Sequence, residues 1–540
     1  MATLQFKGKN IIWNYHMSVP YHTLDLDEKL SYKQDKAGGN LIIEGDNLPA
    51  LKSLLPQYTG KIKCIYIDPP YNTGNEKWVY NDNVNNSMIK EWIGKVVDKN
   101  DLTRHDKWLC MITPRIKLLR DLLSKNGIIF ISIDDNEVHH LKTLFLENGF
   151  NFVAQLVWKG KSGAEDDTYF RTVHEYILVF SRDDYSFVAG EEEKTNEKFP
   201  YTDESSGKKY KTQLLRKWGS NSKREDRPNL YYPIKTPEGK DFYPMLSKEV
   251  EGCWRWGKPA MKRAIEEGRI EFKVNSKGIL EAYEKVFEPK EGEIRTKKFQ
   301  SLLDDVGTTS NGTKELAELL PNERFDHPKP STLIRRLLKM GNTEGNDLIL
   351  DAFAGSGTTA QAVLELNEED GGNRKFILIQ MPENSEKEPN KNICRDITRE
   401  RVVKVIEKKL KNKEVGFEYR RVGQPIDAET ILSGQLPTYK ELAKYVFYLA
   451  TGQSPKDEDI DEKRYLAGKI DQTEVYLLYT PDMEELKKMA ITFEWAKEIS
   501  KGNDNKKIVY APACFMDDEY LEQFNIKFVS IPYNLFEREQ

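Results

Sequence analysis

Two short segments of the chain contain residue types that could bind and modify a flat, nitrogen-bearing group. The first segment is Asp68-Pro69-Pro70-Tyr71, at the end of the apolar run at 64–67. Two prolines cannot lie inside a central strand, so they mark the point where a strand ends. The carboxylate and backbone carbonyls of such a turn can accept hydrogen bonds from an amino group, and the tyrosine ring can stack on a planar one. The segment therefore predicts a site for an exocyclic amine.

The second segment is a glycine-rich turn that follows a strand-like stretch at 348–350. Gly355 and Gly357 let the backbone approach a ligand without a Cβ in the way, which suits a nucleoside-bearing cofactor. Both segments have the order strand, turn and helix, with which an open α/β sheet builds a site at the carboxyl ends of its strands. Together they predict methyl transfer to an amino group of a nucleobase. The turn reads Asp351-Ala352-Phe353-Ala354-Gly355-Ser356-Gly357.

The chemistry of this transfer gives roles to the residues of the first segment. The lone pair of an exocyclic amine is delocalised into its ring, and acceptors for both N–H bonds favour the pyramidal nitrogen that attacks the methyl group. We expect the Asp68 side chain and the Pro69 carbonyl to be these acceptors, because positive charge develops on nitrogen in the transition state. Tyr71 should stack on a base that has been rotated out of the duplex. Trp78 and Tyr80, in the following loop, either assist this stacking or serve as packing.

The elements that must position these segments alternate between strand-like and helix-like patterns, which predicts a parallel sheet. Short apolar runs precede each turn, and two further strand-like runs follow the first group. The expected strands are at 41–43, 64–67, 128–133, 152–158, 174–180, 348–350 and 376–380, and the expected helices at 48–55, 106–125, 332–340, 361–366 and 395–411.

Composition indicates a soluble protein of a reducing compartment. Of the 540 residues, 38% are hydrophobic and 31% are charged. No apolar run reaches the length needed to span a bilayer, and the first residues lack a signal-peptide core. The five cysteines form no CxxC pair. This spacing favours a cytoplasmic location and argues against a structural zinc site, and we expect no metal.

The net charge of -5 means that any binding of nucleic acid must use a local basic surface. One basic run, with Tyr210 and Trp218 interleaved, is the candidate. It is either a solvated charged surface or a set of phosphate contacts, and in this setting we favour phosphate contacts. Its members are Lys208, Lys209, Lys211, Arg216, Lys217, Lys223, Arg224 and Arg227.

The two turns and their order resemble the β arrangement of amino-methylating DNA methyltransferases. In that family the catalytic segment precedes the cofactor segment, and a recognition region lies between them. The resemblance covers the stretches at 40–180 and 325–410. It implies an α/β fold of the Rossmann-like methyltransferase type with a mixed, mostly parallel sheet, S-adenosylmethionine as cofactor, and double-stranded DNA as substrate. Asp at position 68 favours adenine N6 over cytosine N4 as the target.

The same resemblance implies which residues hold S-adenosylmethionine. Lys329 and Pro330, in a Phe-x-His-Pro-Lys-Pro segment, are expected to cover its methionine end, and Asn47 to lie close by. Where an acid often ends the second strand and holds the ribose hydroxyls, this chain has Gln380, and Glu383 is the nearest carboxylate. Either side chain could bond the ribose. The other expected cofactor residues are Asp351, Phe353, Ala354, Gly355, Ser356 and Gly357.

Length, composition and the resemblance together predict several domains. The expected parts are an N-terminal arm at 1–39, the methyltransferase domain at 40–180 and 325–415, an inserted target-recognition domain at 181–324, and a small C-terminal α/β module for docking or dimerisation at 424–540. Within the C-terminal module the expected elements are a hairpin at 466–480, one amphipathic helix at 481–501, and strands at 508–512 and 526–531.

Further segments resemble the modification subunits of type III restriction–modification systems. These segments are at 66–74, 226–234 and 312–316. This second resemblance implies a homodimer in which one copy reads the DNA sequence while the other methylates. It also implies a helicase–nuclease restriction subunit as a partner.

Several other functions share parts of this pattern. An orphan DNA methyltransferase, specific for adenine N6 or cytosine N4, would carry the same catalytic turns. Methylation of RNA or of a protein amide meets the same planar-nitrogen problem, but the large middle region favours a long polymer and Asp68 favours DNA adenine. A DNA-recognition scaffold for a partner nuclease would not need both turns intact. A nicotinamide dehydrogenase is disfavoured because the Gly-x-Gly-x-x-Gly fingerprint is absent.

Overall fold

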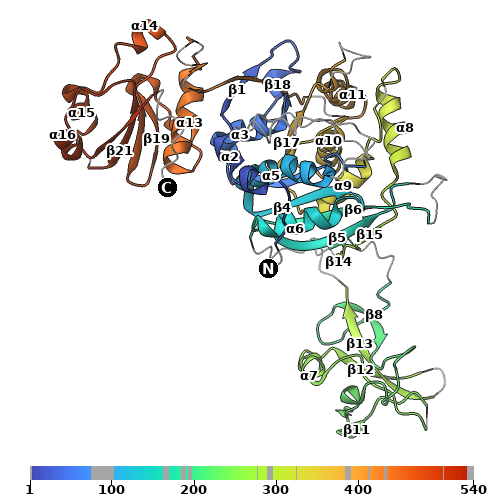
Figure 1. Ribbon diagram of the computed structural model, residues 1–540. Coiled ribbons are helices and arrows are strands. Elements are labelled where there is room, and N and C mark those ends of the chain that lie inside the picture. Colours follow the sequence, from blue (N-terminus) through green and yellow to red (C-terminus); the bar gives the residue numbers. More distant parts are fainter. Residues whose placement is uncertain are drawn as a thin grey trace. The chain divides into compact units, whose positions relative to one another are not determined.

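The computed structural model describes the chain in two compact units, residues 1–189 with 299–540, and residues 190–298 (Figure 1). The loop with Trp78 and Tyr80 lies outside the described residues. The described residues are 3–73, 103–161, 170–183, 190–192, 198–247, 249–275, 278–288, 296–323, 325–383, 391–411, 414–427, 429–430, 433–434, 436–502 and 504–531.

A 10-stranded sheet forms the centre of the larger unit. Its strands are β1 (His22–Leu26), β2 (Leu41–Glu44), β3 (Ile62–Ile67), β4 (Leu123–Ile133), β5 (Asn151–Trp158), β6 (Glu175–Ser181), β15 (Leu302–Leu303), β16 (Leu348–Asp351), β17 (Lys375–Gln380) and β18 (Glu418–Pro425). Their order across the sheet is β1-β18-β2-β17-β16-β3-β4-β6-β5-β15. The strands from β18 to β4 run parallel, whereas β1 and β6 pair antiparallel with their inner neighbours. The predicted α/β fold with a mixed, mostly parallel sheet is confirmed.

Helices cover both faces of this sheet because successive strand residues point to opposite sides. Along β3, Ile65 and Ile67 belong to one buried cluster, and Cys64 and Tyr66 to the other. Helices of the first face are α3 (Asn47–Tyr58), α5 (Arg104–Leu122) and α6 (Val138–Glu147). Helices of the second face are α8 (Thr309–Leu319), α9 (Ser331–Met340), α10 (Thr358–Asp370) and α11 (Glu400–Lys408), the last preceded by a π-helical turn at Ile393–Arg399.

Two parts of the chain join the central sheet where the sequence predicted otherwise. Within the predicted arm at 1–39, two short helices, α1 (Lys9–Ile12) and α2 (Tyr15–Ser18), precede β1, which pairs with β18 at the sheet edge. At the other edge, β15 and α8, both within the predicted insert at 181–324, pack with the sheet unit. In both cases the partner lies far along the chain, so no local pattern reveals the pairing.

The unit at 190–298 consists mostly of short antiparallel strands around a small aromatic core. Trp254 is buried in that core, and its indole N–H donates to the Tyr232 carbonyl at 2.7 Å. The elements are β7 (Gly190–Glu192), β8 (Tyr201–Thr202), β9 (Lys209–Leu214), β10 (Ile234–Lys235), β11 (Asp241–Phe242), α7 (Lys258–Glu266), β12 (Ile270–Val274), β13 (Leu280–Phe287) and β14 (Thr296–Lys298).

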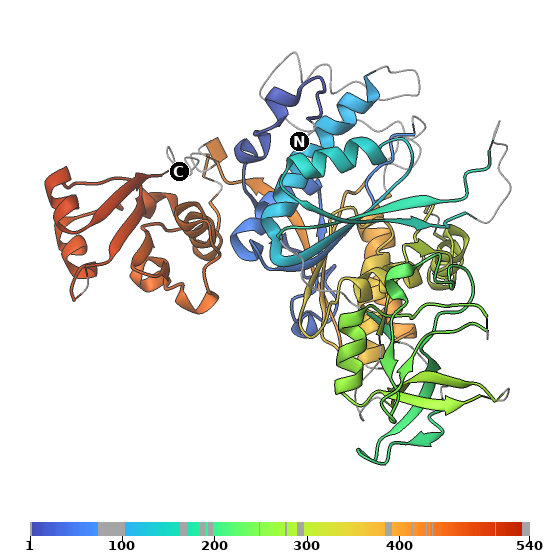
Figure 2. The ribbon, with the colours of Figure 1, turned by 90° about the horizontal axis from the view of Figure 1, so that it is seen from below.

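The C-terminal part of the larger unit contains a four-stranded sheet with helices on both faces (Figure 2). The predicted hairpin is confirmed, since β19 and β20 follow each other along the chain and pair antiparallel. The single helix predicted at 481–501 is wrong: two short helices form, and between them Ile491 bridges to Cys514. The elements are α13 (Tyr439–Thr451), β19 (Leu466–Ile470), β20 (Thr473–Leu477), α14 (Met483–Leu486), α15 (Phe493–Ile499), β21 (Lys506–Ala511), α16 (Asp518–Gln523) and β22 (Ile526–Ser530).

The five cysteines are all free thiols. Among the described residues, no helix combines the length and the apolar character that crossing a membrane requires.

Candidate functional site

The two turns singled out in the sequence leave neighbouring strands at the same edge of the central sheet. β3 and β16 pair in parallel, with Tyr66 beside Asp351, so Asp68 and the glycine-rich turn emerge side by side. β17 flanks β16 and ends at Gln380, whereas β4 flanks β3. The carboxyl ends of these strands therefore form one concentrated site, as expected for an open α/β sheet.

Lys329 binds the carboxylate of Asp68. Its Nζ lies 2.9 Å from Asp68 Oδ1 and 2.8 Å from Oδ2. The backbone before Lys329 is held by α8, where a Cβ at Gly312 would collide with the Pro328 carbonyl oxygen. This close approach requires glycine at position 312, and it fixes the segment from which Lys329 reaches the catalytic turn.

Glu175 completes this group from the start of β6, and sequence reasoning missed it. Glu175 Oε2 lies 3.6 Å from Lys329 Nζ and 3.0 Å from the Tyr71 hydroxyl, which is also 2.9 Å from Asp68 Oδ1. The hydroxyl has one proton, so it can donate to one carboxylate at a time. The only available signal was a charged residue at the entrance to an apolar strand.

The electrostatic balance keeps Lys329 charged. Burial alone would lower the pKa of its ammonium, but the carboxylates of Asp68 and Glu175 outweigh burial and raise it. Burial, then Asp68 and Glu175, raise the pKa of the Tyr71 hydroxyl well above its ordinary value. Two carboxylates thus share one ammonium and one neutral hydroxyl, which leaves an excess of negative charge.

A tryptophan of α5 holds the middle of the catalytic turn. The Trp108 indole N–H donates to the Pro70 carbonyl at 2.7 Å. The Pro70 oxygen is therefore engaged by the protein itself. Pro69, the residue expected to offer its carbonyl to an amine, precedes this anchored position.

Asp351 organises the glycine-rich turn from within. Its Oδ1 accepts from the Phe353 N–H at 3.0 Å, and its Oδ2 accepts from the Thr359 hydroxyl at 2.5 Å. Gly355 and Gly357 both have left-handed backbone angles, with φ of 52° and 81°. A side chain is disfavoured at both positions, which keeps the backbone of the turn open to a ligand.

Several of the residues predicted to contact the cofactor form hydrogen bonds or packing contacts with other parts of the protein, and these contacts hold the glycine-rich turn in place. The Ser356 hydroxyl accepts from the buried Arg401 at 2.7 Å. Asn47 donates to the Ala352 carbonyl at 3.0 Å and accepts from Arg115. The Ala354 N–H donates to the carbonyl of Ile379 on β17, and Phe353 packs against the core of the first face. Pro330 is buried and directly precedes α9.

Gln380 and Glu383 lie next to each other beside the glycine-rich turn. The Gln380 side-chain carbonyl accepts from the Gly355 N–H at 2.6 Å. Its amide group donates to the Glu383 carboxylate at 2.8 Å. Both polar groups of the Gln380 side chain therefore form hydrogen bonds, and its amide orients the Glu383 carboxylate just after β17.

The basic run of the smaller unit has exposed and partly buried members, and Arg216 and Arg224 form ion pairs. Arg216 donates twice to Glu281 Oε1, at 2.8 and 2.9 Å, and Arg224 donates to Glu251 at 2.7 Å. The exposed members are Lys208, Lys209, Lys223, Arg224 and Arg227, and the partly buried ones are Lys211, Arg216 and Lys217.

Comparison with known proteins places the chain in a family. The family described as DNA methylase matches residues 62–391. The chain is 35% identical over 402 residues to the type III restriction-modification enzyme EcoPI Mod subunit of Escherichia phage P1. This match covers 68% of this chain and 61% of that subunit. It is 32% identical over 375 residues to the type II methyltransferase M.KpnI of Klebsiella pneumoniae, covering 66% of this chain and 84% of that enzyme. The chain belongs to the DNA methylase family.

One of the solved structures that the comparison matched is that of PvuII DNA methyltransferase (cytosine-N4-specific). It shares 12% identity, covers 68% of this chain and 93% of its own, and has a TM-score of 0.34. The chain spans about three fifths of the length of the EcoPI Mod subunit, at 61%.

Asp351→Asn should weaken the dependence of stability on pH. Burial raises the pKa of Asp351 from 3.8 to about 7. The folded protein thus keeps this carboxyl protonated at pH values where the unfolded chain releases the proton, so stability falls as pH rises from about 4 to 7. The fall in Tm between about pH 5 and pH 7.5 should be smaller in the variant, because asparagine does not ionise. Asp35→Asn, at an exposed carboxyl, is the control; equal slopes in both variants would contradict the assignment.

Proposed function

We propose that this protein is a site-specific DNA adenine N6-methyltransferase that uses S-adenosylmethionine, and that it is the modification and recognition subunit of a type III restriction–modification system. The observation that carries the proposal is the pairing of the Asp68-to-Tyr71 turn with the glycine-rich turn on adjacent strands, in a chain of the DNA methylase family. The similarity to the EcoPI Mod subunit supports the type III assignment. Asp at position 68 supports adenine.

The residues beside the glycine-rich turn fit S-adenosylmethionine. When bound, this cofactor supplies an electrophilic methyl group on a sulfonium, which leaves as a neutral thioether. The left-handed backbone at Gly355 and Gly357 admits a ligand close to the main chain. Glu383 is the better candidate for the ribose hydroxyls, because the Gln380 carbonyl already accepts from Gly355 and its amide aligns the Glu383 carboxylate.

At the amine, the side chain of Asp68 and the backbone of Pro69 act as acceptors. A carboxylate offers about four lone-pair sites, so Asp68 can keep its contacts to Lys329 and still accept an N6 proton. N6 would become acidic only as it receives the methyl group that the bound cofactor supplies. Asp68 therefore does not need to remove the proton beforehand. The negative excess of the Asp68, Glu175 and Lys329 group stabilises the charge that develops on N6.

Tyr71 stacks on the flipped base in this proposal. Rotation of a base out of a duplex costs a few kcal/mol, and stacking on an aromatic ring returns about 1–3 kcal/mol. The contact of its hydroxyl with Asp68 and Glu175 fixes the ring at the mouth of the acceptor pair. The base and the acceptors are thereby placed by the same hydrogen-bonded group.

A methyltransferase that acts without a restriction partner is the second candidate. It is retained because the match to M.KpnI, a type II methyltransferase rather than a type III subunit, extends over 84% of that enzyme. The type III proposal includes a homodimer, a helicase–nuclease partner and a cytoplasmic location. Light scattering of the purified protein and co-purification with a co-expressed restriction subunit would separate the two candidates.

The first experiment measures methyl transfer from labelled S-adenosylmethionine to unmethylated bacterial DNA, followed by nucleoside analysis. N6-methyldeoxyadenosine is the expected product. Asp68→Ala should lower turnover by about 10²–10³-fold, because it removes an acceptor that acts in the transition state. Asp35→Ala is the matched control, and cofactor binding by calorimetry should persist in both. Label on N4-methylcytosine would overturn the choice of base, and full turnover of Asp68→Ala would overturn its role.

Lys329→Met separates the two roles open to this lysine. Since its ammonium lies against Asp68, we expect kcat to fall by about 10–100-fold, the range for one charge-assisted hydrogen bond, while the cofactor Kd changes little. Lys314→Met, at an exposed lysine of α8, should behave as wild type. A large rise in cofactor Kd with unchanged kcat would instead place Lys329 on the methionine end of the cofactor.

Neutralising Lys208, Lys209 and Lys211 together should flatten the salt dependence of DNA binding. For every lysine that binds a phosphate, its removal should reduce the slope of log K against log salt by about 0.9. Filter binding across a salt series measures the slope. Lys487→Gln, in the C-terminal module, is the control. An unchanged slope in the triple variant would show that the basic run is only a solvated surface.

A further inference from the structure

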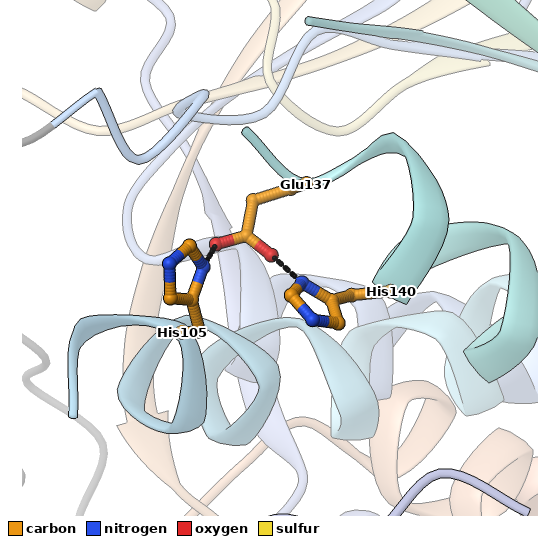
Figure 3. Close-up of side chains that lie close together, drawn as sticks. All are labelled: His105, Glu137 and His140. Carbon is orange, nitrogen blue, oxygen red and sulfur yellow. Dashed lines mark hydrogen bonds and ion pairs between the residues drawn. The ribbon is translucent and has the colours of Figure 1, made fainter. Parts of the chain in front are cut away.

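A second group of ionisable side chains lies outside the proposed chemistry: His105, Glu137 and His140 (Figure 3). Glu137 is fully buried between the end of β4 and the start of α6. Its Oε1 lies 2.6 Å from His105 Nδ1 on α5, and its Oε2 lies 2.8 Å from His140 Nδ1 on α6. One buried carboxylate therefore joins two helices through two partly exposed imidazoles.

The same carboxylate reaches the catalytic turn. Asn72, the residue directly after Tyr71, is fully buried and donates from Nδ2 to Glu137 Oε1 at 2.5 Å. Asn72 has a left-handed backbone angle, with φ of 61°, a region that asparagine enters more readily than most residues with a Cβ. Its Oδ1 has no hydrogen-bond partner among the described residues. Glu137 is thus the anchor that the structure provides for this side chain.

The geometry favours hydrogen bonds over a metal ion. Ligand atoms on one tetrahedral zinc ion, each at about 2.0–2.2 Å, would be about 3.3 Å from one another. The two Nδ1 atoms lie closer than that to the Glu137 oxygens, at 2.6 and 2.8 Å, within hydrogen-bond range. The hydrogen bond to Glu137 also outweighs burial and raises the pKa of His140. Imidazoles that donate from Nδ1 orient the carboxylate between them.

We propose that Glu137 is a positioning residue for methyl transfer, whose buried carboxylate holds Asn72 and through it the Asp68-to-Tyr71 turn. This inference rests on the proposed function. Helix α5 then holds the turn on both sides of Tyr71: Trp108 binds the Pro70 carbonyl, and His105 orients Glu137 against Asn72. Without the anchor, Asn72 can leave its left-handed conformation and Tyr71 can move. A displacement of about 1 Å at a reacting centre costs about 10²-fold in rate.

The test is a double-mutant cycle on the full-length protein, with methyl transfer to DNA as the readout. Asn72→Ala and Glu137→Ala should each lower kcat by about 10–100-fold, with the cofactor Kd within about threefold of wild type. The double variant should be no worse than the poorer single variant, because both changes cut the same link. His139→Gln, at the exposed histidine next to the cluster, should leave kcat unchanged.

The outcomes separate this inference from the proposed function. A wild-type protein that methylates no DNA would count against the proposed function, and the inference would fall with it. An active wild type with normal kcat in both single variants, or with losses that multiply in the double variant, would overturn the inference alone. If Glu137→Ala does not fold, His105→Gln replaces it in the cycle with the same expectation. Stoichiometric zinc in the purified protein, or loss of activity in EDTA, would overturn it in favour of a metal site.

Discussion

The parallel pairing of β3 with β16 is the contact around which the rest of the site is arranged. It brings a carboxylate turn and a glycine-rich turn to one edge, although a whole inserted unit separates them along the chain. The strands on the outer sides then contribute their own ends: Gln380 from β17 and Glu137 after β4. A register change of one residue between β3 and β16 would turn their alternating side chains to the wrong faces, so packing of both cores protects the geometry of the site.

The charged side chains of the site must balance one another because little water reaches them. Lys329 has a side chain only 8% exposed, and such a cation is tolerated because two carboxylates face it. The arrangement is stable only while all members remain, because loss of one leaves an uncompensated buried charge. The same low local polarity strengthens the hydrogen bond that the Tyr71 hydroxyl donates to either of its two neighbouring carboxylates. A substitution at any one of Asp68, Glu175 and Lys329 is therefore expected to disturb the other two as well.

The sequence was sufficient for the fold class and for the two turns, because proline pairs and glycines act locally and mark strand ends without help from distant residues. It could not reveal Glu175 or Glu137, since each gains its role only through neighbours on other elements of the fold. For the same reason the sequence predicts an arm where β1 forms, because its partner β18 lies nearly 400 residues further along the chain. The helix expected at 481–501 failed because a bridge from Ile491 to Cys514 interrupts an otherwise helical pattern.

The strand order has a consequence for how the protein is made. β2 and β3 leave the ribosome early, but in the sheet they are separated by β16 and β17, which follow some 300 residues later. Until those strands are synthesised, the early strands have unpaired edges and uncovered apolar faces, which is a risk of misassociation during translation. Completion of the sheet must await the late strands, and the high sequence separation of its central pairs makes this step slow. The nascent chain therefore has a long interval in which a chaperone would be of use.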